Sequence, residues 1–249
     1  MELPCSIELN THAFDCVPLE RRNTIIESFS NASEQIRKIV NKYWNSLDYV
    51  EEQTLYFDEE TGELKDITSH YCSSFTERCI VMNRKNQNDE YGVVFRHEYG
   101  HYIDDAIGRY SEDKEFREAF QMDKENFDNS KDKGISNVEK MLQDLSENTA
   151  AFESRYISDI LSAIMMNDTK VRNFYADNQR PFYKHSDAYW LENNENIHNE
   201  VFANLFAIYT ENNSNVISFS EKWFPSLSCH FRYGIEKEVE YKEKELLKI

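Results

Sequence analysis

Glycine and proline are scarce in this chain, whose 249 residues include 6 Gly and 4 Pro. A turn-rich β sandwich or barrel uses these residues at many chain reversals, so the shortage disfavours such folds and favours long helices. Aromatic residues are plentiful by contrast. The chain has 15 Tyr and 16 Phe, which provide enough apolar area for a sizeable core.

Long apolar runs are missing as well. No stretch of 18 apolar residues occurs, so the sequence predicts no helix that spans a bilayer. Residues 1–16, MELPCSIELNTHAFDC, contain acidic side chains and lack the apolar segment of a signal peptide. We therefore expect a cytoplasmic protein.

Basic residues are outnumbered by acidic ones, 28 to 46, which gives a formal net charge of −18. A chain of this charge repels nucleic acids and anionic membranes before any contact forms, so we expect neither as a partner. The same argument disfavours a nuclease. The acidic surface keeps the protein soluble, and it would suit basic peptides as substrates.

Paired cysteine motifs are absent. The five cysteines form an odd number and contain no CxxC pair, a pattern that predicts free thiols in a reducing compartment. They are Cys5, Cys16, Cys72, Cys79 and Cys229.

Hydrophobic periodicity predicts an α+β fold that is mostly helical, with a small sheet. We expect a single domain over 1–249, with a helical N-terminal region (1–70) and a charged helical tail (219–249). Ser136 and Glu139 have the spacing of a capping box at a helix start. The expected helices are 19–47, 112–127, 136–168 (one long helix or two joined), 197–212 and the tail, which breaks near Pro225. Residues 78–84 are expected to form a strand, and residues 53–68 a hairpin or a loop. Loops are expected over 129–134 and 169–196.

The segment VVFRHEYGHYIDDAIG, residues 93–108, carries the most specific pattern in the chain. His97 and His101 are four positions apart, so on a helix they project about 40° from each other on one face. Two histidines one helical turn apart can both place an imidazole nitrogen on the same zinc ion. Glu98 would flank the metal and act as the general base for a zinc-activated water.

Other residues of this segment support the same interpretation. Gly100 would cost about 1 kcal/mol relative to Ala in an ordinary helix, and it suits close approach by a neighbouring backbone or a substrate. Asp104 and Asp105 follow His101 by one turn and are expected to orient a ligand histidine as hydrogen-bond acceptors. The alternative is a surface helix with two solvated histidines.

A catalytic zinc site requires a third protein ligand. The metzincin pattern needs Gly and His three and six positions after the second histidine, where this chain has Asp104 and Ile107, so that class is excluded. The remaining candidates are His12, His70, His185, His198, His230 or a carboxylate on another helix.

Glu200 is the best of these candidates. It begins the apolar segment HNEVFANLFAIY (198–209), where a buried carboxylate needs a partner that a metal would supply. Asn204, one turn later, would hydrogen-bond a ligand histidine. Two alternatives remain open: Glu200 complements the helix dipole, or His198 is the ligand instead.

With these residues the chain resembles the gluzincin branch of the zinc metallopeptidases, in which a glutamate on a second helix is the third ligand. HEYGHYIDD (97–105), SDILSAI (158–164), AYW (188–190) and EVFANLF (200–206) occur in the order seen in the zincin-like domains of phage minor-head and head-morphogenesis proteins. The catalytic domain of anthrax lethal factor is a more distant likeness. The resemblance covers about 78–210.

The resemblance implies one Zn²⁺ per chain, held by His97, His101 and Glu200, with Glu98 as the base. The HExxH helix would pack on the ligand-bearing helix of a zincin-like domain. Two departures stand out. His101 and Glu200 are 99 positions apart, so the intervening helices must form a subdomain or a wall of the cleft. Asn204 occupies a position that is often acidic in gluzincins and adds no charge.

The expected function is that of a zinc-dependent endopeptidase rather than an exopeptidase, acting on a peptide or protein. Tyr189 and His185 are the expected donors to the oxyanion of the tetrahedral intermediate. Alternatively, Tyr189 is a packed aromatic residue. Residues 78–84 are placed as the edge strand that pairs with an extended peptide.

The resemblance adds phage structural proteins as partners and a bacterial cytosol or phage particle as the location. The alternative function is a non-catalytic, zinc-stabilised structural or binding module of a phage or mobile-element protein.

Overall fold

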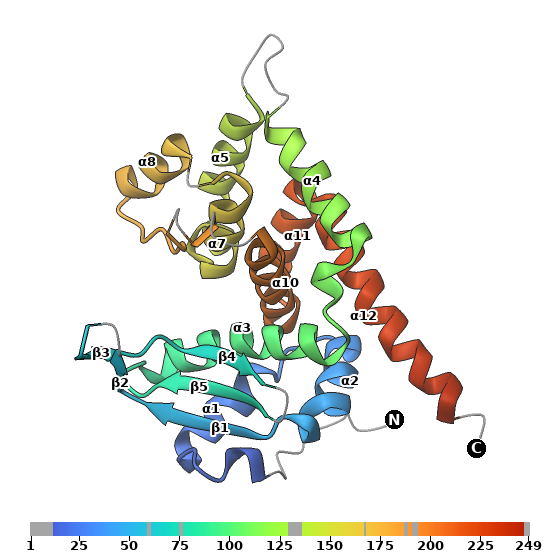
Figure 1. Cartoon of the computed structure of the whole chain (residues 1–249). Helices are drawn as coiled ribbons and strands as arrows, with labels where there is room; N and C mark the ends of the chain where they lie inside the picture. The colour runs from blue at the N-terminus through green and yellow to red at the C-terminus, as the bar shows by residue number, and fades with distance from the viewer. Residues whose placement is uncertain are drawn as a thin grey trace.

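Helices dominate the fold, and a three-stranded sheet lies at one end of it (Figure 1). The computed structural model describes residues 12–58, 61–74, 77–128, 136–166, 168–186, 189–190 and 194–246. The expected α+β, mostly helical class is confirmed. The main helices are α1 (Leu19–Ser28), α2 (Glu34–Tyr43), α3 (Asn88–Ala106), α4 (Lys114–Asp128), α5 (Asn137–Glu147), α6 (Thr149–Glu153), α7 (Arg155–Ile164), α8 (Thr169–Asp177), α10 (Asn194–Glu211), α11 (Ser214–Trp223) and α12 (Pro225–Leu246).

The sheet has the strand order β1-β5-β4, from Tyr49–Gln53, Arg78–Asn83 and His70–Ser73. β1 runs parallel to β5, and β4 runs antiparallel to it. The strand expected over 78–84 is confirmed, but its expected place at the sheet edge is wrong. Four consecutive residues of β5 are buried, because the strand is covered on both faces and flanked by two neighbours. Among the described strands β4 pairs only with β5, so β4 is the edge strand on that side.

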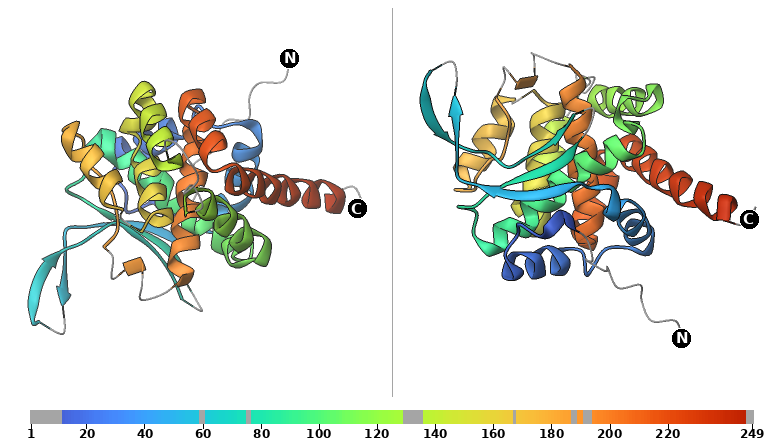
Figure 2. Two further views of the ribbon diagram at one scale, coloured as in Figure 1. Left: turned by 90° about the horizontal axis from the view of Figure 1, so that it is seen from above. Right: turned by 60° about the horizontal axis from the view of Figure 1, so that its bottom comes forward.

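β2 (Leu55–Asp58) and β3 (Glu63–Asp66) form a hairpin that extends from the body of the molecule (Figure 2). The hairpin alternative for residues 53–68 is therefore confirmed. Gly62 has a φ of +71°, which a residue without Cβ adopts without strain. The expectation of a helical N-terminal region over residues 1–70 is wrong beyond α2, because β1, β2 and β3 follow that helix.

α3 is the central element of the fold. It packs against α1, β4 and β5, and it also packs along α10 (Figure 1). The close approach expected at Gly100 is confirmed, since a Cβ there would lie 2.8 Å from both the Cα and the carbonyl oxygen of Ala203. Buried aromatic residues fill the space around this crossing and fix the two helices against each other. They include Phe95, Tyr99, Tyr102, Phe202 and Phe206.

Polar residues divide two of the expected long helices. The helix expected over 19–47 is wrong as one element, since Ser33 accepts a hydrogen bond from the Ile36 N–H and starts α2 separately from α1. Residues 136–168 form three helices rather than one or two. Ser136 begins α5 with the expected capping box, and Asn148 and Ser154 cap α6 and α7.

The loop expected over 169–196 is also corrected. Asp168 accepts hydrogen bonds from Lys170 N–H and Val171 N–H and thereby starts α8 within it. The loop expected over 129–134 lies outside the described residues. The break near Pro225 is confirmed, because α11 ends at Trp223 and α12 begins at Pro225, a first-turn position that proline favours.

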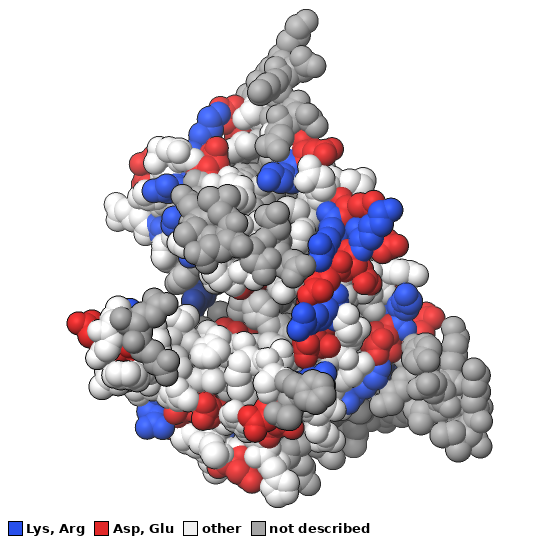
Figure 3. All heavy atoms as spheres, viewed as in Figure 1, with Lys and Arg blue, Asp and Glu red and all other residues white. Residues whose placement is uncertain are grey.

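Cys72 and Cys79 face each other across β4 and β5 and form a disulfide, so the expectation of free thiols is wrong for this pair. A cysteine count cannot show that two residues are register partners. Cys16 and Cys229 are free, and Cys5 lies outside the described residues. On the face seen in Figure 3, acidic and basic side chains are interspersed rather than segregated. No described helix combines the length and apolar character that a bilayer crossing requires.

Candidate metal centre

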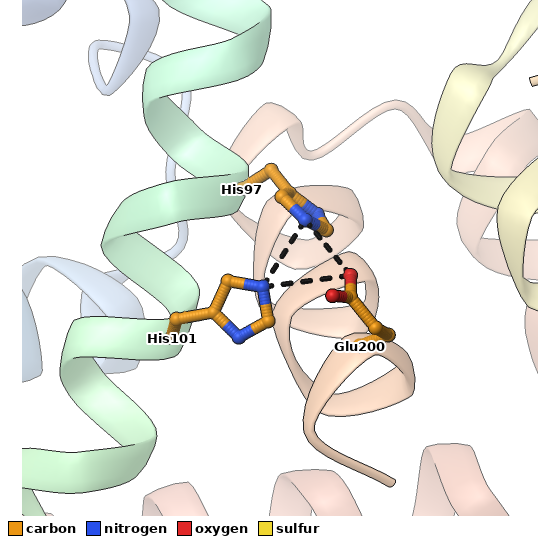
Figure 4. A group of neighbouring side chains, drawn as sticks. All are labelled: His97, His101 and Glu200. Carbon is orange, nitrogen blue, oxygen red and sulfur yellow. Dashed lines mark hydrogen bonds and ion pairs between the residues drawn. The ribbon is translucent and has the colours of Figure 1, made fainter. Parts of the chain in front are cut away.

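Three side chains from two helices point at one position (Figure 4). The Nε2 atoms of His97 and His101, both on α3, are 3.2 Å apart. Oε2 of Glu200, on α10, lies 3.1 Å from the first and 3.5 Å from the second. Ligands about 2.0–2.1 Å from a tetrahedral metal ion are about 3.3–3.4 Å from each other, so these separations fit such a site.

A positive charge between the three atoms would complement the buried carboxylate of Glu200. Oε2 of Glu200 is buried and has no well-formed hydrogen bond within the described residues. Burial alone would raise the pKa of Glu200, but the imidazoles of His101, His185 and His97 hold it well below its usual range. A carboxylate oxygen and two imidazole nitrogens in this arrangement could hold a metal ion.

Asn204 fixes the ring of His97. Its Oδ1 lies 3.1 Å from Nδ1 of His97, in agreement with the contact expected from the sequence. The Nδ2 of Asn204 donates to Oδ2 of Asp159 on α7 at 2.8 Å. Sequence reasoning missed Asp159, although one signal was present: it is a single acidic residue in the apolar segment YISDILSAI (156–164), all of which is buried.

Glu98 lies beside the three-residue group and is buried. Its Oε2 accepts the Tyr71 N–H of β4 at 2.9 Å, so the edge strand and α3 are joined at this carboxylate. Burial raises the pKa of Glu98 to about 7, against the opposing effect of the His97 charge. A carboxylate with a pKa near neutrality can both take and return a proton.

His185 and Tyr189 also contact Glu200. The Tyr189 hydroxyl donates to Oε1 of Glu200 at 2.5 Å, and Nε2 of His185 lies 3.3 Å from Oε2. The two rings stack with their centroids 4.1 Å apart. Burial lowers the pKa of His185, but Glu200 and Asp159 outweigh it and raise the pKa to about 9. Asp159, His185 and Glu200 form a second group that could hold a metal ion.

Asp104 and Asp105 do not make the expected hydrogen bonds to a ligand histidine. Asp104 is buried and accepts the Ser111 N–H at 2.9 Å and the Ser111 hydroxyl. Asp105 accepts the Tyr71 hydroxyl at 2.9 Å and Nε–H of Arg78 at 3.0 Å. The expectation is wrong because donors from neighbouring elements, which the local sequence does not reveal, engage both carboxylates.

Of the histidines considered as third ligands, His185 is the one that belongs, among the described residues, to a group that could hold a metal ion. His198 packs against Phe120 with ring centroids 5.1 Å apart, away from the group formed by His97, His101 and Glu200. His70 Nδ1 lies 2.8 Å from the Thr68 carbonyl oxygen.

Two cavities of about 560 and 530 Å³ meet at the candidate centre. Both are lined by Thr68, Ser69, His97, Glu98 and His185. The first continues past Tyr189 and Arg109, and the second past Arg155 and Tyr156 on α7. Figure 3 shows the recess between the sheet and the helices opposite it. The space therefore extends from the centre in two directions, and α7, from the long segment between His101 and Glu200, forms one wall.

Comparisons with protein-family models, with curated proteins and with solved structures gave no match to this chain.

Proposed function

We propose that the protein is a zinc-dependent endopeptidase with a zincin-like, gluzincin-type fold. His97, His101 and Glu200 hold one Zn²⁺, and Glu98 is the general base. The observation that carries this proposal is the convergence of three ligand atoms, 3.1–3.5 Å apart, beside a buried carboxylate. Two imidazoles and one carboxylate are a ligand set that suits zinc and leaves a position open for substrate.

A bound zinc ion supplies Lewis-acid chemistry, since it polarises a carbonyl oxygen and acidifies a water molecule. The protein supplies the proton transfers. Glu98 takes a proton from the water that attacks the peptide carbonyl and returns it to the leaving amine. The Tyr71 N–H engages one oxygen of Glu98, which leaves the other oxygen to carry the proton.

His185 is the better of the two expected oxyanion donors. A phenol has one proton, so Tyr189 cannot donate to an oxyanion while it donates to Glu200, whereas an imidazolium has a second N–H besides the Nε2–H that faces Glu200. In the metal-free chain Glu200 and Asp159 raise the pKa of His185 to about 9, and His185 lines both cavities. We therefore assign His185 to stabilising the developing oxyanion and Tyr189 chiefly to holding Glu200.

The substrate is an extended peptide or protein segment that passes through both cavities, which supports cleavage within a chain rather than at its end. It pairs with the edge of β4 that no described strand occupies, where Tyr71 is already joined to the base. The net charge of −18 favours basic substrates over nucleic acids or anionic membranes. Phage structural proteins are the partners that the motif resemblance suggests.

The second candidate function is a zinc-stabilised structural or binding module. The observation in its favour is that the ligand set joins α3 to α10, two helices far apart in sequence, so that a bound ion would cross-link the fold.

Cleavage of a peptide library by the zinc-loaded wild type and by Glu98→Gln separates the two functions. We expect Glu98→Gln to bind zinc as the wild type does and to cleave roughly 10²–10⁴-fold more slowly. Equal cleavage rates would reject Glu98 as the base. A wild type that loses thermal stability on chelation, yet cleaves no peptide, would favour the structural module.

A further inference from the structure

The buried carboxylate of Asp159 is linked to His97 through one intervening side chain, that of Asn204. Asp159 on α7 accepts a hydrogen bond from Nδ2 of Asn204 at 2.8 Å, and Oδ1 of Asn204 faces Nδ1 of His97 at 3.1 Å. We propose that Asp159 is a positioning residue. Through the side chain of Asn204, it keeps a proton on Nδ1 of His97 and leaves the lone pair on Nε2 for the metal ion. The proposal rests on the zinc site described above.

The direction of each hydrogen bond follows from the one before it. A buried carboxylate that is ionised only accepts, so the end of the Asn204 amide that meets Asp159 must be its NH₂ group. The carbonyl end then meets His97, and it accepts a hydrogen bond only if Nδ1 carries the proton. Nε2 of His97 is thereby left with its lone pair, directed at the position faced by His101 and Glu200.

Without Asp159 the amide could turn over at little cost. Its NH₂ group would then face Nδ1 of His97 and favour the tautomer with the proton on Nε2. That tautomer has its lone pair on Nδ1 and none on Nε2, the nitrogen that faces the metal position. The carboxylate therefore fixes the metal-binding tautomer.

The arrangement also supplies the charge that Asn204 lacks. A carboxylate paired with a ligand histidine raises the basicity of that ligand. Here the charge sits on Asp159, one hydrogen bond further out. Its burial, with 7% of the residue exposed, keeps water from screening it.

A purely structural role explains Asp159 poorly. Its second oxygen, Oδ1, is buried and has no hydrogen-bond partner within the described residues. An apolar residue at this buried position would avoid the desolvation of a carboxylate. Nε2 of His185 lies 3.8 Å from Oδ2 of Asp159, longer than a hydrogen bond.

The test measures zinc affinity by competition with a chromogenic chelator, so it does not depend on cleavage. Asp159→Asn keeps the size of the side chain and removes the charge, and Asn204→Ala removes the connecting amide. We expect each variant to bind zinc about 10–100-fold more weakly, as for other partners of ligand histidines. Because the residues act in series, the double variant Asp159→Asn/Asn204→Ala should lose no more than either single one.

A second double variant moves the charge inward. In Asp159→Asn/Asn204→Asp the new carboxylate at position 204 accepts directly from His97 and in turn accepts from the amide at 159. Zinc affinity should recover most of the loss caused by Asp159→Asn alone. This variant preserves the number of hydrogen bonds, so it also serves if Asp159→Asn folds poorly.

Long-range ¹H–¹⁵N spectra of the metal-free protein report the tautomer itself. The wild type should carry a proton on Nδ1 of His97, whether or not Nε2 is also protonated toward Glu200, and Asp159→Asn should lose part of that Nδ1 proton. Asp123→Asn is the matched control. Asp123 is also buried but accepts the N–H groups of Ser226 and Leu227, so its loss should lower stability and leave zinc affinity and the His97 tautomer unchanged.

Several outcomes overturn the proposal. If the wild type binds zinc and Asp159→Asn binds it equally well, Asp159 does not position His97. Additive losses in Asp159→Asn/Asn204→Ala would show that the residues act independently. Two zinc ions per wild-type chain, with one lost in Asp159→Asn, would make Asp159 a direct ligand together with His185 and Glu200. A wild type that binds no zinc would instead refute the proposed function itself.

Discussion

Gly100 and Ala203 are in van der Waals contact range at the crossing of α3 and α10, where a Cβ on Gly100 would lie 2.8 Å from the Ala203 backbone. The same two helices carry the three candidate ligands, His97 and His101 on one and Glu200 on the other. The separation of the helix axes thus determines whether the carboxylate reaches the two imidazoles. Gly100, which has no side chain, therefore determines how closely Glu200 can approach His97 and His101.

We expect Gly100→Ala to push the helices apart and weaken zinc binding. The added methyl group would overpack the crossing, which typically costs about 1–3 kcal/mol, of which helix propensity returns about 1 kcal/mol. Urea unfolding and chelator competition measure the two effects. Gly92→Ala is the control on the same helix, because its Cβ would meet Ser28 of α1 at 3.0 Å. Equal zinc affinity in both variants would contradict this account.

Glu200→Ala should reduce the zinc content from one ion per chain to nearly none after dialysis against a weak chelator. The two remaining imidazoles cannot complete a three-ligand site. Metal analysis by mass spectrometry measures the content. His198→Ala is the matched control on the same helix, since His198 packs against Phe120 and lies outside the ligand group. Zinc retention by Glu200→Ala at the wild-type level would refute the assignment of Glu200.

Tyr189→Phe should weaken zinc binding about tenfold, in the range seen for residues that hold metal ligands in place. The variant keeps the ring that stacks on His185 and loses only the hydroxyl that donates to Glu200. Peptide cleavage should therefore recover at saturating zinc. A large fall in kcat that excess zinc does not restore would instead make Tyr189 an oxyanion donor. Tyr183→Phe, in the second cavity, is the control.

The contribution of Asp104 to the unfolding free energy of the metal-free protein should fall as the pH rises from about 4 to about 6. Burial raises the pKa of Asp104 to about 6 in the folded state, although the hydrogen bonds from Ser111 oppose this. The folded chain therefore binds a proton more tightly than the unfolded chain, and stability is highest below the unfolded pKa. Two pKa units correspond to about 3 kcal/mol.

Urea unfolding of the metal-free wild type and of Asp104→Asn across this pH range checks the prediction. The amide does not titrate, so the difference in unfolding free energy between the two proteins should change in the stated direction. A constant difference from about pH 4 to about pH 7 would show that Asp104 titrates alike in the folded and unfolded chains.

The local geometry of the site was accessible from the sequence. The spacing of His97 and His101 fixes both imidazoles on one helical face wherever that helix packs, because helix geometry is a property of the backbone. Glu200 gave a weaker signal, as a carboxylate entering an apolar helix that needed a partner. Neither pattern showed which face of α3 would meet α10.

Other features depended on contacts between segments far apart in the chain. Asp159, the pairing of Cys72 with Cys79, and the role of β4 as the edge strand all escaped sequence reasoning. Each is defined by a neighbour that no local pattern identifies. The diversion of Asp104 to Ser111 has the same cause, since a buried carboxylate takes whichever donor packing brings to it.

The sequence by itself determined a mostly helical chain with two histidines and a candidate base in fixed mutual positions on one helix. Only the tertiary structure decided that Glu200 closes the group and that Asp159 stands behind Asn204. The physical reason is that periodicity and capping act over one or two helical turns, whereas ligand sets and buried polar networks form only when packing joins separate helices.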